Sequence, residues 1–254
     1  MLEIVNVTKY YGALAAIRGV SFTARRGEVL GCLGPNGSGK STTVNIVAGL
    51  LDPTSGEVRV DGEDIRRDLF AHRRRIGYVP ETPEVYSYLT GPEYLTLVGR
   101  LRRIAPDVLE EKIERFLRLF GIYGDRHGRL SGYSKGMRQK ILIAAGLLHD
   151  PEIVVLDEPS SGLDVGTTLV LKQLIRALAA DGKIVLYSSH VLEFVEQVCS
   201  SVVILREGRV AASDRIERLE ELMNQPSLEQ VWRQLALHDD TDEVASGLIE
   251  AMRL

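Results

Sequence analysis

A glycine-rich segment in the first quarter of the chain has the residue types and spacing to hold a polyphosphate. Residues 34–41 read Gly-Pro-Asn-Gly-Ser-Gly-Lys-Ser and match the pattern G-x-x-x-x-G-K-[ST], between an apolar run and a helical pattern. Glycines let backbone N–H groups turn inward around phosphate oxygens, and a helix N-terminus adds a favourable dipole. These flanks favour a functional motif over a chance match. We expect phosphate contacts from Gly34, Asn36, Gly37, Ser38, Gly39, Lys40, Ser41 and Thr42.

Two carboxylates further along the chain complete the chemistry of phosphoryl transfer. Asp157 and Glu158 follow the apolar run Ile153–Leu156 and so stand at a strand end, where ligands gather in open α/β sheets. Taken alone, such a pair is typical of a solvated turn, but the phosphate-binding pattern upstream favours catalysis. We expect Lys40 to reach the β- and γ-phosphates, Ser41 and Asp157 to hold Mg²⁺, and Glu158 to polarise the attacking water.

A histidine follows another predicted strand. His190 comes shortly after Ile184–Tyr187, so its imidazole would lie near the same phosphate site if the two strands are neighbours. A structural or solvated histidine is the alternative interpretation.

Apolar runs alternate with helical patterns and predict how these residues are positioned. The alternation is typical of a mostly parallel sheet covered by helices, here an α/β P-loop NTPase core with a small antiparallel part at Thr54–Gly62. The expected strands are Leu2–Val7, Glu28–Leu33, Arg75–Val79, Ile153–Leu156, Ile184–Tyr187 and Val202–Leu205, and the expected helices Lys40–Leu50, Thr167–Ala180 and Val191–Cys199.

Helical spacing dominates two further regions. Pro92–Leu148 reads as a helical subdomain inserted at about residues 90–148, with a helix capped by Asp107. We expect residues 1–212 to form one domain and 213–254 a helical extension, broken at Pro226 and ending in the acidic stretch His238–Glu243. The predicted apolar face of the capped helix comprises Val108, Leu109, Ile113, Phe116, Leu117 and Phe120.

Composition excludes several classes of protein. A formal net charge of −4 over 254 residues argues against binding nucleic acid through a broad basic surface. Cys32 and Cys199 stand apart from any metal-ligand spacing and read as reduced core thiols, and Met1–Ile4 shows no secretory signal. The longest uncharged apolar stretch, Ile141–Leu148, is far shorter than the roughly 18 to 20 residues that cross a bilayer as a helix.

The motifs, in this order, resemble those of the ABC ATPase family over Leu2–Ala212. The resemblance implies a head-to-tail dimer that encloses ATP between the P-loop of one subunit and a signature motif of the other. Of two registers for that motif, Leu130–Ser134 puts a tyrosine where a close backbone approach needs glycine, whereas Tyr133–Met137 opens a helical run. The second register implies that Ser134 and Gly136 contact the partner's γ-phosphate. Read without the family, Ser134 would be only a helix cap.

Three further positions take expected roles from the same resemblance. Tyr11 resembles the aromatic residue that stacks on adenine, with core packing as the alternative. Ser161–Asp164 resembles the loop that links the two sites, and His190 the histidine that holds the γ-phosphate. Glu81 stands where most members have glutamine, so we expect a Mg²⁺ ligand with altered metal dependence.

Two segments resemble the exporter branch of the family, which moves drugs, lipids, polysaccharides or sodium with the permease on another chain. These are Tyr78–Glu81 and the tail Ser227–Trp232, although the tail also reads as a plain amphipathic helix. We therefore expect an ATP hydrolase with ATP and Mg²⁺ as cofactors, a membrane permease and a second, identical cassette as partners, and a place at the cytoplasmic face of the membrane. An importer, a soluble ABC ATPase acting on ribosomes or DNA, and a regulatory subunit with little turnover are the alternatives. The sequence does not name the cargo.

Overall fold

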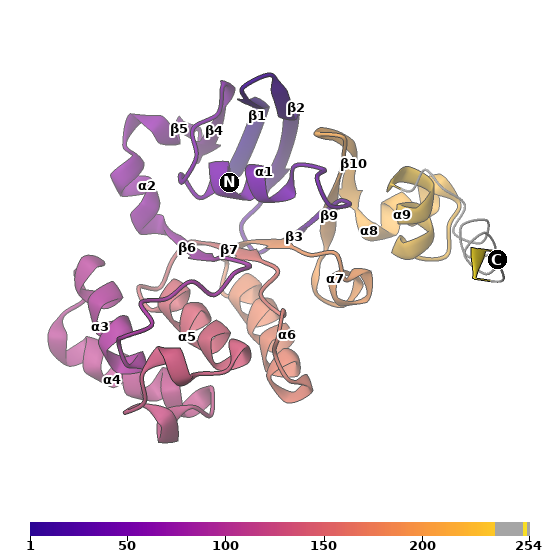
Figure 1. Cartoon of the computed structure of the whole chain (residues 1–254). Helices are drawn as coiled ribbons and strands as arrows, with labels where there is room; N and C mark the ends of the chain where they lie inside the picture. The colour runs from indigo at the N-terminus through magenta and orange to yellow at the C-terminus, as the bar shows by residue number, and fades with distance from the viewer. Residues whose placement is uncertain (237–250, 253–254) are drawn as a thin grey trace.

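Two sheets and a set of helices make up the computed structural model, which describes residues 1–236 and 251–252 (Figure 1). The larger sheet has the strand order β10-β9-β3-β8-β7-β6, with all neighbours parallel except the antiparallel pair β9 and β10. Its strands are β3 (Val29–Leu33), β6 (Ile76–Val79), β7 (Ile153–Asp157), β8 (Ile184–Ser188), β9 (Ser201–Arg206) and β10 (Arg209–Arg215).

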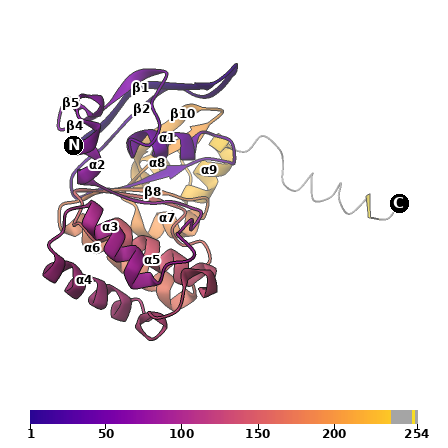
Figure 2. The same cartoon turned by 60° about the vertical axis from the view of Figure 1, so that its left-hand side comes forward.

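The smaller sheet is antiparallel throughout, with the order β2-β1-β4-β5. Both views place it above the parallel sheet, with helix α1 (Lys40–Val47) beneath it (Figure 2). Its strands are β1 (Leu2–Tyr11), β2 (Leu14–Ala24), β4 (Ser55–Val60) and β5 (Glu63–Asp64). The predicted mostly parallel sheet with a small antiparallel part is confirmed.

Residues of the parallel strands alternate between two cores because successive side chains of a strand point to opposite faces. In β3, Leu30 and Cys32 pack toward α1 and the antiparallel sheet, whereas Val29 and Leu33 pack toward the helices on the other face. All five residues of β3 are buried, and so are all five of β7 and β8, which is why these strands read as continuous apolar runs. The helices on that other face include α5 (Lys135–Leu147), α6 (Val165–Ala180) and α7 (Leu192–Val198).

The inserted helical part lies on the side of the parallel sheet away from β1 and β2. It contains α3 (Gly91–Leu101), α4 (Pro106–Leu119) and α5. Thr90 caps α3 through a capping box with Glu93. The predicted cap of α4 is wrong: Ala105 is the N-cap and Asp107 lies in the first turn, because Pro106 occupies the first helical position. Val108 is 44% exposed and so does not belong to the apolar face, where Leu109, Ile113 and Leu117 are buried.

Several elements were absent from the sequence-based prediction, among them β2, β10 and α2 (Leu69–Arg75). Strands β2 and β10 lie at sheet edges, and β10 alternates exposed with half-buried residues, so neither carries the apolar run of a central strand. Helix α2 ends in four basic residues and runs directly into β6, which therefore begins at Ile76 rather than Arg75. Helix α1 ends at Val47, before the predicted Leu50, because Gly49 takes a positive φ of 67°.

The chain after β9 continues the same folded unit. The predicted boundary at residue 212 falls inside β10. Helices α8 (Ile216–Met223) and α9 (Leu228–Ala236) contribute Ile216, Leu219, Leu228 and Val231 to the core that also holds α5 to α7. The acidic stretch His238–Glu243 lies outside the described residues.

Candidate functional site

The loop between β3 and α1 holds its shape through glycines at crowded positions. Gly39, the N-cap of α1, has φ 101°, and a Cβ there would lie 2.3 Å from Ile17 Cγ2. A Cβ on Gly34 would lie 2.7 Å from the carbonyl oxygen of Leu205. Since real Cβ atoms do not approach so closely, both positions require glycine. The predicted glycine-rich loop thus leads from a buried strand into a helix N-terminus.

Lys40 is buried and folded back over this loop. Its Nζ donates hydrogen bonds to the carbonyl oxygens of Gly34 at 2.6 Å and Pro35 at 3.2 Å. The ammonium group therefore stands at the mouth of the loop and lines the cavity above it. Ser38 is 2% exposed, and its side chain lies under the loop against Gly34 and does not line the cavity above it, so the expected phosphate contact of Ser38 stays a prediction.

The two expected carboxylates are both buried at the end of β7. Asp157 is the last residue of the strand, and Glu158 follows with a positive φ of 46° and donates its N–H to the Ser188 carbonyl at 2.9 Å. Burial raises the pKa of Asp157, and the nearby carboxylates Glu81 and Glu158 raise it further, against the lowering effects of Ser188 and Lys40. A cation placed beside Asp157 would relieve this repulsion.

Glu158 is paired with the histidine predicted to share its site. His190 Nδ1 lies 2.6 Å from Glu158 Oε1, and Ser189 Oγ donates to Glu158 Oε2 at 3.2 Å. The Glu158 side chain is only 8% exposed, whereas that of His190 is 68% exposed. The Glu158 carboxylate is thus buried and held by Ser189 and His190. The imidazole of His190 is exposed, so a ligand in the cavity can contact it.

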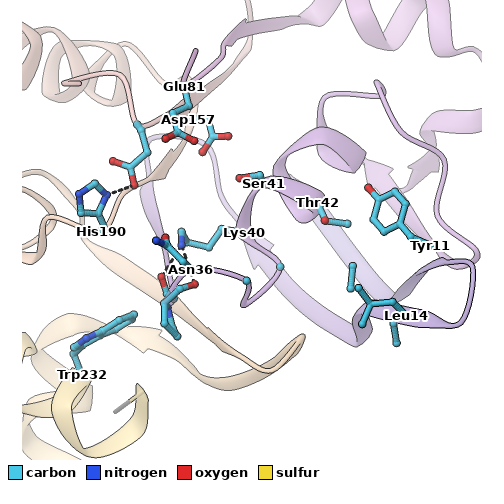
Figure 3. A pocket seen from close by; sticks show the side chains of 17 residues that line it. Tyr11, Leu14, Asn36, Lys40, Ser41, Thr42, Glu81, Asp157, His190 and Trp232 are labelled. Carbon is cyan, nitrogen blue, oxygen red and sulfur yellow. Dashed lines mark hydrogen bonds and ion pairs between the residues drawn. The ribbon is translucent and has the colours of Figure 1, made fainter. Parts of the chain in front are cut away.

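These residues line one cavity of about 680 Å³ (Figure 3). Tyr11 lies on one side of the glycine-rich loop, next to Thr42, and Glu81, Asp157 and His190 gather on another. Tyr11 is 50% exposed, so the alternative of core packing is wrong for it. The full lining is Tyr11, Leu14, Ala15, Ala16, Gly34, Pro35, Asn36, Gly37, Gly39, Lys40, Ser41, Thr42, Glu81, Asp157, Glu158, His190 and Trp232.

The sequence reasoning missed part of this lining. Leu14, Ala15 and Ala16 come from the start of β2, and their small or apolar side chains carry no motif. Trp232 comes from α9, and only the resemblance of the tail to an exporter ending marked that segment.

The segment Tyr133–Met137, which was expected to be the signature motif, lies elsewhere on the molecule. Ser134 caps α5 by accepting a hydrogen bond from the Met137 N–H at 3.2 Å, and neither Ser134 nor Gly136 lines the cavity. A Cβ on Gly136 would lie 2.6 Å from the Gly162 carbonyl oxygen, so this position needs glycine. Tyr133 is buried, and its hydroxyl donates to the Asp125 carbonyl at 2.8 Å. Helix α5 therefore begins where the second register places it.

The oxygen atoms at the site are the donors that Mg²⁺ prefers. Ser41, Glu81 and Asp157 all line the cavity beside Lys40. Within the described residues, no group of three His, Cys, Asp or Glu side chains is placed to hold a metal ion by itself. The donor set therefore fits a cation that is bound together with phosphate oxygens rather than in a protein cage.

Comparison with known proteins connects the site to a family. The family model described as ABC transporter matches residues 17–161. YxlF of Bacillus subtilis, described as an uncharacterized ABC transporter ATP-binding protein, is 40% identical over 221 residues, 87% of this chain and 73% of its own. The Nod factor export ATP-binding protein I of Rhizobium meliloti is 34% identical over 214 residues, 84% of this chain and 64% of its own.

A solved structure gives the same fold. The ATP-binding cassette MJ0796, described as a dimeric post-hydrolysis state bound to ADP and Pi, superimposes with a TM-score of 0.78 at 27% identity. The match covers 85% of this chain and 98% of the cassette. Among the described residues, no helix is long and apolar enough to cross a membrane.

Proposed function

This chain belongs to the ATP-binding subunits of ABC transporters, whose activity is ATP hydrolysis, and from that premise we propose that it drives export through a permease on a separate chain. The observation that supports the ATP-hydrolysing part of this proposal is that one cavity brings Lys40, Asp157, Glu158 and His190 together. These are the side chains that position a triphosphate, hold its cation and orient water.

Within that cavity each residue has a proposed task. Tyr11 stacks on the adenine, the glycine-rich loop with Asn36 and Thr42 surrounds the phosphates, and Lys40 contacts the β- and γ-phosphates. Mg²⁺, held by Ser41, Glu81 and Asp157, would supply charge neutralisation when bound. Glu158 orients the attacking water, and His190 leaves its pairing with Glu158 to hold the γ-phosphate.

We propose a dimer of identical chains as the working unit. Ser134 and Gly136 lie outside the cavity of their own chain, at the exposed start of α5, where a helix N-terminus favours an anion. A second chain in head-to-tail arrangement would bring this segment to the γ-phosphate. The dimeric ADP and Pi complex of the MJ0796 cassette supports the dimer.

The similarities favour export as the direction of transport. The proposed location of this subunit is the cytoplasmic face of the membrane. The name of the Rhizobium relative states export, and the segments Tyr78–Glu81 and Ser227–Trp232 resemble the exporter branch. The proposed partner is a polytopic permease without a cassette of its own, and nucleic acid is not a proposed partner.

A pull-down tests the partner. Two variants serve as bait in detergent-solubilised membranes of the native host. Glu158→Gln with ATP and Mg²⁺ should hold the dimer closed. Lys40→Ala, which should lose nucleotide affinity, is the control. The expected result is a polytopic membrane protein that is enriched with the first variant. Recovery of ribosomal or DNA-bound proteins without a permease would overturn the transporter role and leave the ATPase in place.

The direction is tested with the captured complex in vesicles that carry the cassette on their outer face. Accumulation of sodium, lipid or drug probes inside on addition of ATP supports export. Release from preloaded vesicles would indicate an importer.

A further inference from the structure

Helix α9 is anchored on the nucleotide-binding core at three points. Leu228 and Val231 are fully buried in the core shared with α7 and β9. The backbone N–H of Leu228 donates to Glu196 Oε1 of α7 at 2.8 Å, and Arg206 Nη1 at the end of β9 donates to the Leu235 carbonyl at 3.0 Å. The helix thus has one defined docking position beside the strands that carry the site.

Trp232 lies at the edge of the apolar face through which α9 docks. Residues three and four apart share a helix face, so Leu228, Val231 and Leu235 turn to the core together. Trp232, next to Val231, is half-buried: part of its indole packs on this core and part lines the cavity. An indole offers a large apolar surface and one N–H donor, a combination suited to a boundary between a core and a polar ligand.

The indole lines the cavity on the side away from Tyr11. Figure 3 shows Trp232 across the glycine-rich loop from Tyr11, on the side of Asn36 and below His190. Tyr11 marks the adenine end of the proposed ATP position, so Trp232 stands at the opposite end. Leu228 and Val231 are already fully buried, and Leu235 and part of the Trp232 indole pack beside them, so the rest of the indole is left facing the cavity.

We propose that α9 is a wall of the nucleotide pocket, and that Trp232 makes nucleotide binding and docking of α9 mutually dependent. The indole lines the cavity only while α9 is docked, so bound ATP must favour the docked helix to the same extent that docking favours ATP. The tail is then a nucleotide-responsive element of the cassette. This inference rests on the proposed ATP position in the cavity.

The first test needs no variant of the helix. Trp232 is the only tryptophan in the 254 residues, so intrinsic tryptophan emission reports this residue alone. Titration of the full chain with ADP and with ATP should shift the emission with the same midpoint as calorimetric binding, and Lys40→Ala should give neither signal. Repeating the titration with ADP and over a tenfold range of protein concentration distinguishes an emission change caused by nucleotide in the pocket from one caused by dimer formation. Only the second should depend on the protein concentration. Calorimetric saturation without any change in emission would overturn the inference.

The second test asks whether the coupling runs in both directions. Amide hydrogen exchange of residues 228–236 should slow when nucleotide is added to the wild-type chain. Trp232→Ala should weaken nucleotide binding about five- to tenfold, the lower end of typical coupling between sites, and should abolish that slowing. Trp232→Phe keeps an aromatic wall and should stay close to wild type.

Gln230→Ala is the matched control, since Gln230 is exposed on the other side of α9. The inference would be overturned if a Trp232→Ala chain with a native circular dichroism spectrum bound nucleotide with wild-type affinity. It would also be overturned if the amide hydrogen exchange of α9 in the wild-type chain did not change on addition of nucleotide. If Trp232→Ala does not fold, the nucleotide affinity of Trp232→Phe and the hydrogen exchange of the wild-type chain test the inference instead. A wild-type chain that binds no nucleotide at all would instead remove the proposed ATP site itself.

Discussion

The ammonium group of Lys135, the first residue of α5, donates a hydrogen bond to Ser161 Oγ at 2.7 Å. The lysine stem lies across the next residue, so that a Cβ on Gly162 would be 2.9 Å from Lys135 Cδ. Ser161 in turn donates its backbone N–H to the Glu158 carbonyl at 3.1 Å. The start of the signature helix is therefore connected through one side chain to the turn that carries the proposed catalytic carboxylate.

The first prediction is that Lys135 acts on hydrolysis through Ser161. Lys135→Met and Ser161→Ala should each lower the ATPase rate about threefold to fivefold, the effect of one largely exposed hydrogen bond to a charged group, and the double variant should lower it no further. Lys135→Arg should retain most of the rate. Steady-state ATPase assays of the four variants measure the coupling. Additive losses would indicate that Lys135 acts separately, through its charge on the partner's nucleotide.

The second prediction concerns the buried carboxylate. Glu158→Gln removes the group that orients water but keeps its size, so ATP hydrolysis should fall by at least about 100-fold while ATP affinity stays within about twofold. Single-turnover hydrolysis and calorimetry measure the two quantities. Glu193→Gln, on the exposed side of α7, is the control and should change neither. Hydrolysis at the wild-type rate in Glu158→Gln would remove Glu158 from this role.

The third prediction concerns the carboxylate that replaces the usual glutamine. Glu81 adds negative charge beside Asp157 and beside the proposed position of the phosphates. Glu81→Gln should raise the Mg²⁺ concentration for half-maximal hydrolysis and tighten ATP binding in EDTA, each by about fivefold, which corresponds to a screened charge interaction of about 1 kcal/mol. Glu84→Gln, an exposed glutamate of the same loop outside the cavity, is the comparison. An unchanged Mg²⁺ requirement would show that Glu81 is not a metal ligand.

The fourth prediction concerns stability at acidic pH. Burial, with Arg102 nearby, lowers the pKa of His149 from 6.5 to about 4, and His149 Nε2 lies 3.0 Å from the Ile76 carbonyl. Between pH 6.5 and 4 the unfolded chain binds a proton here that the folded chain does not, so the free energy of unfolding should fall as the pH falls across this window. His149→Gln keeps an N–H donor but does not titrate.

Urea denaturation at several pH values measures this effect. The loss of stability across the window should be smaller in His149→Gln than in wild type, and unchanged in His127→Gln, whose side chain is exposed. Equal pH dependence in all three proteins would contradict the assignment.

Much of the site was predictable because its parts are contiguous in sequence. The crowding at Gly34, Gly39 and Gly136 allows only glycine, so their spacing in the chain already indicated the loop and the start of α5. The buried strands β3, β7 and β8 carry continuous apolar runs, which indicated the parallel sheet and placed Asp157 at its edge. A backbone position that needs glycine and a strand that is buried on both faces can each be recognised from the local sequence, as a glycine at a fixed spacing and as a continuous apolar run.

The remaining features depend on contacts between distant segments. Edge strands β2 and β10 are half-exposed, so no apolar run marked them, and the position of Trp232 at the cavity depends on how α9 packs against α7 and β9. The sequence by itself determined the glycine-rich loop, the carboxylate pair after the apolar run of β7 and the helical run of α5. Only the tertiary structure decided that His190 meets Glu158 and that Trp232 of the tail lines the same cavity, because side chains far apart in the chain become neighbours only when the core between them is packed.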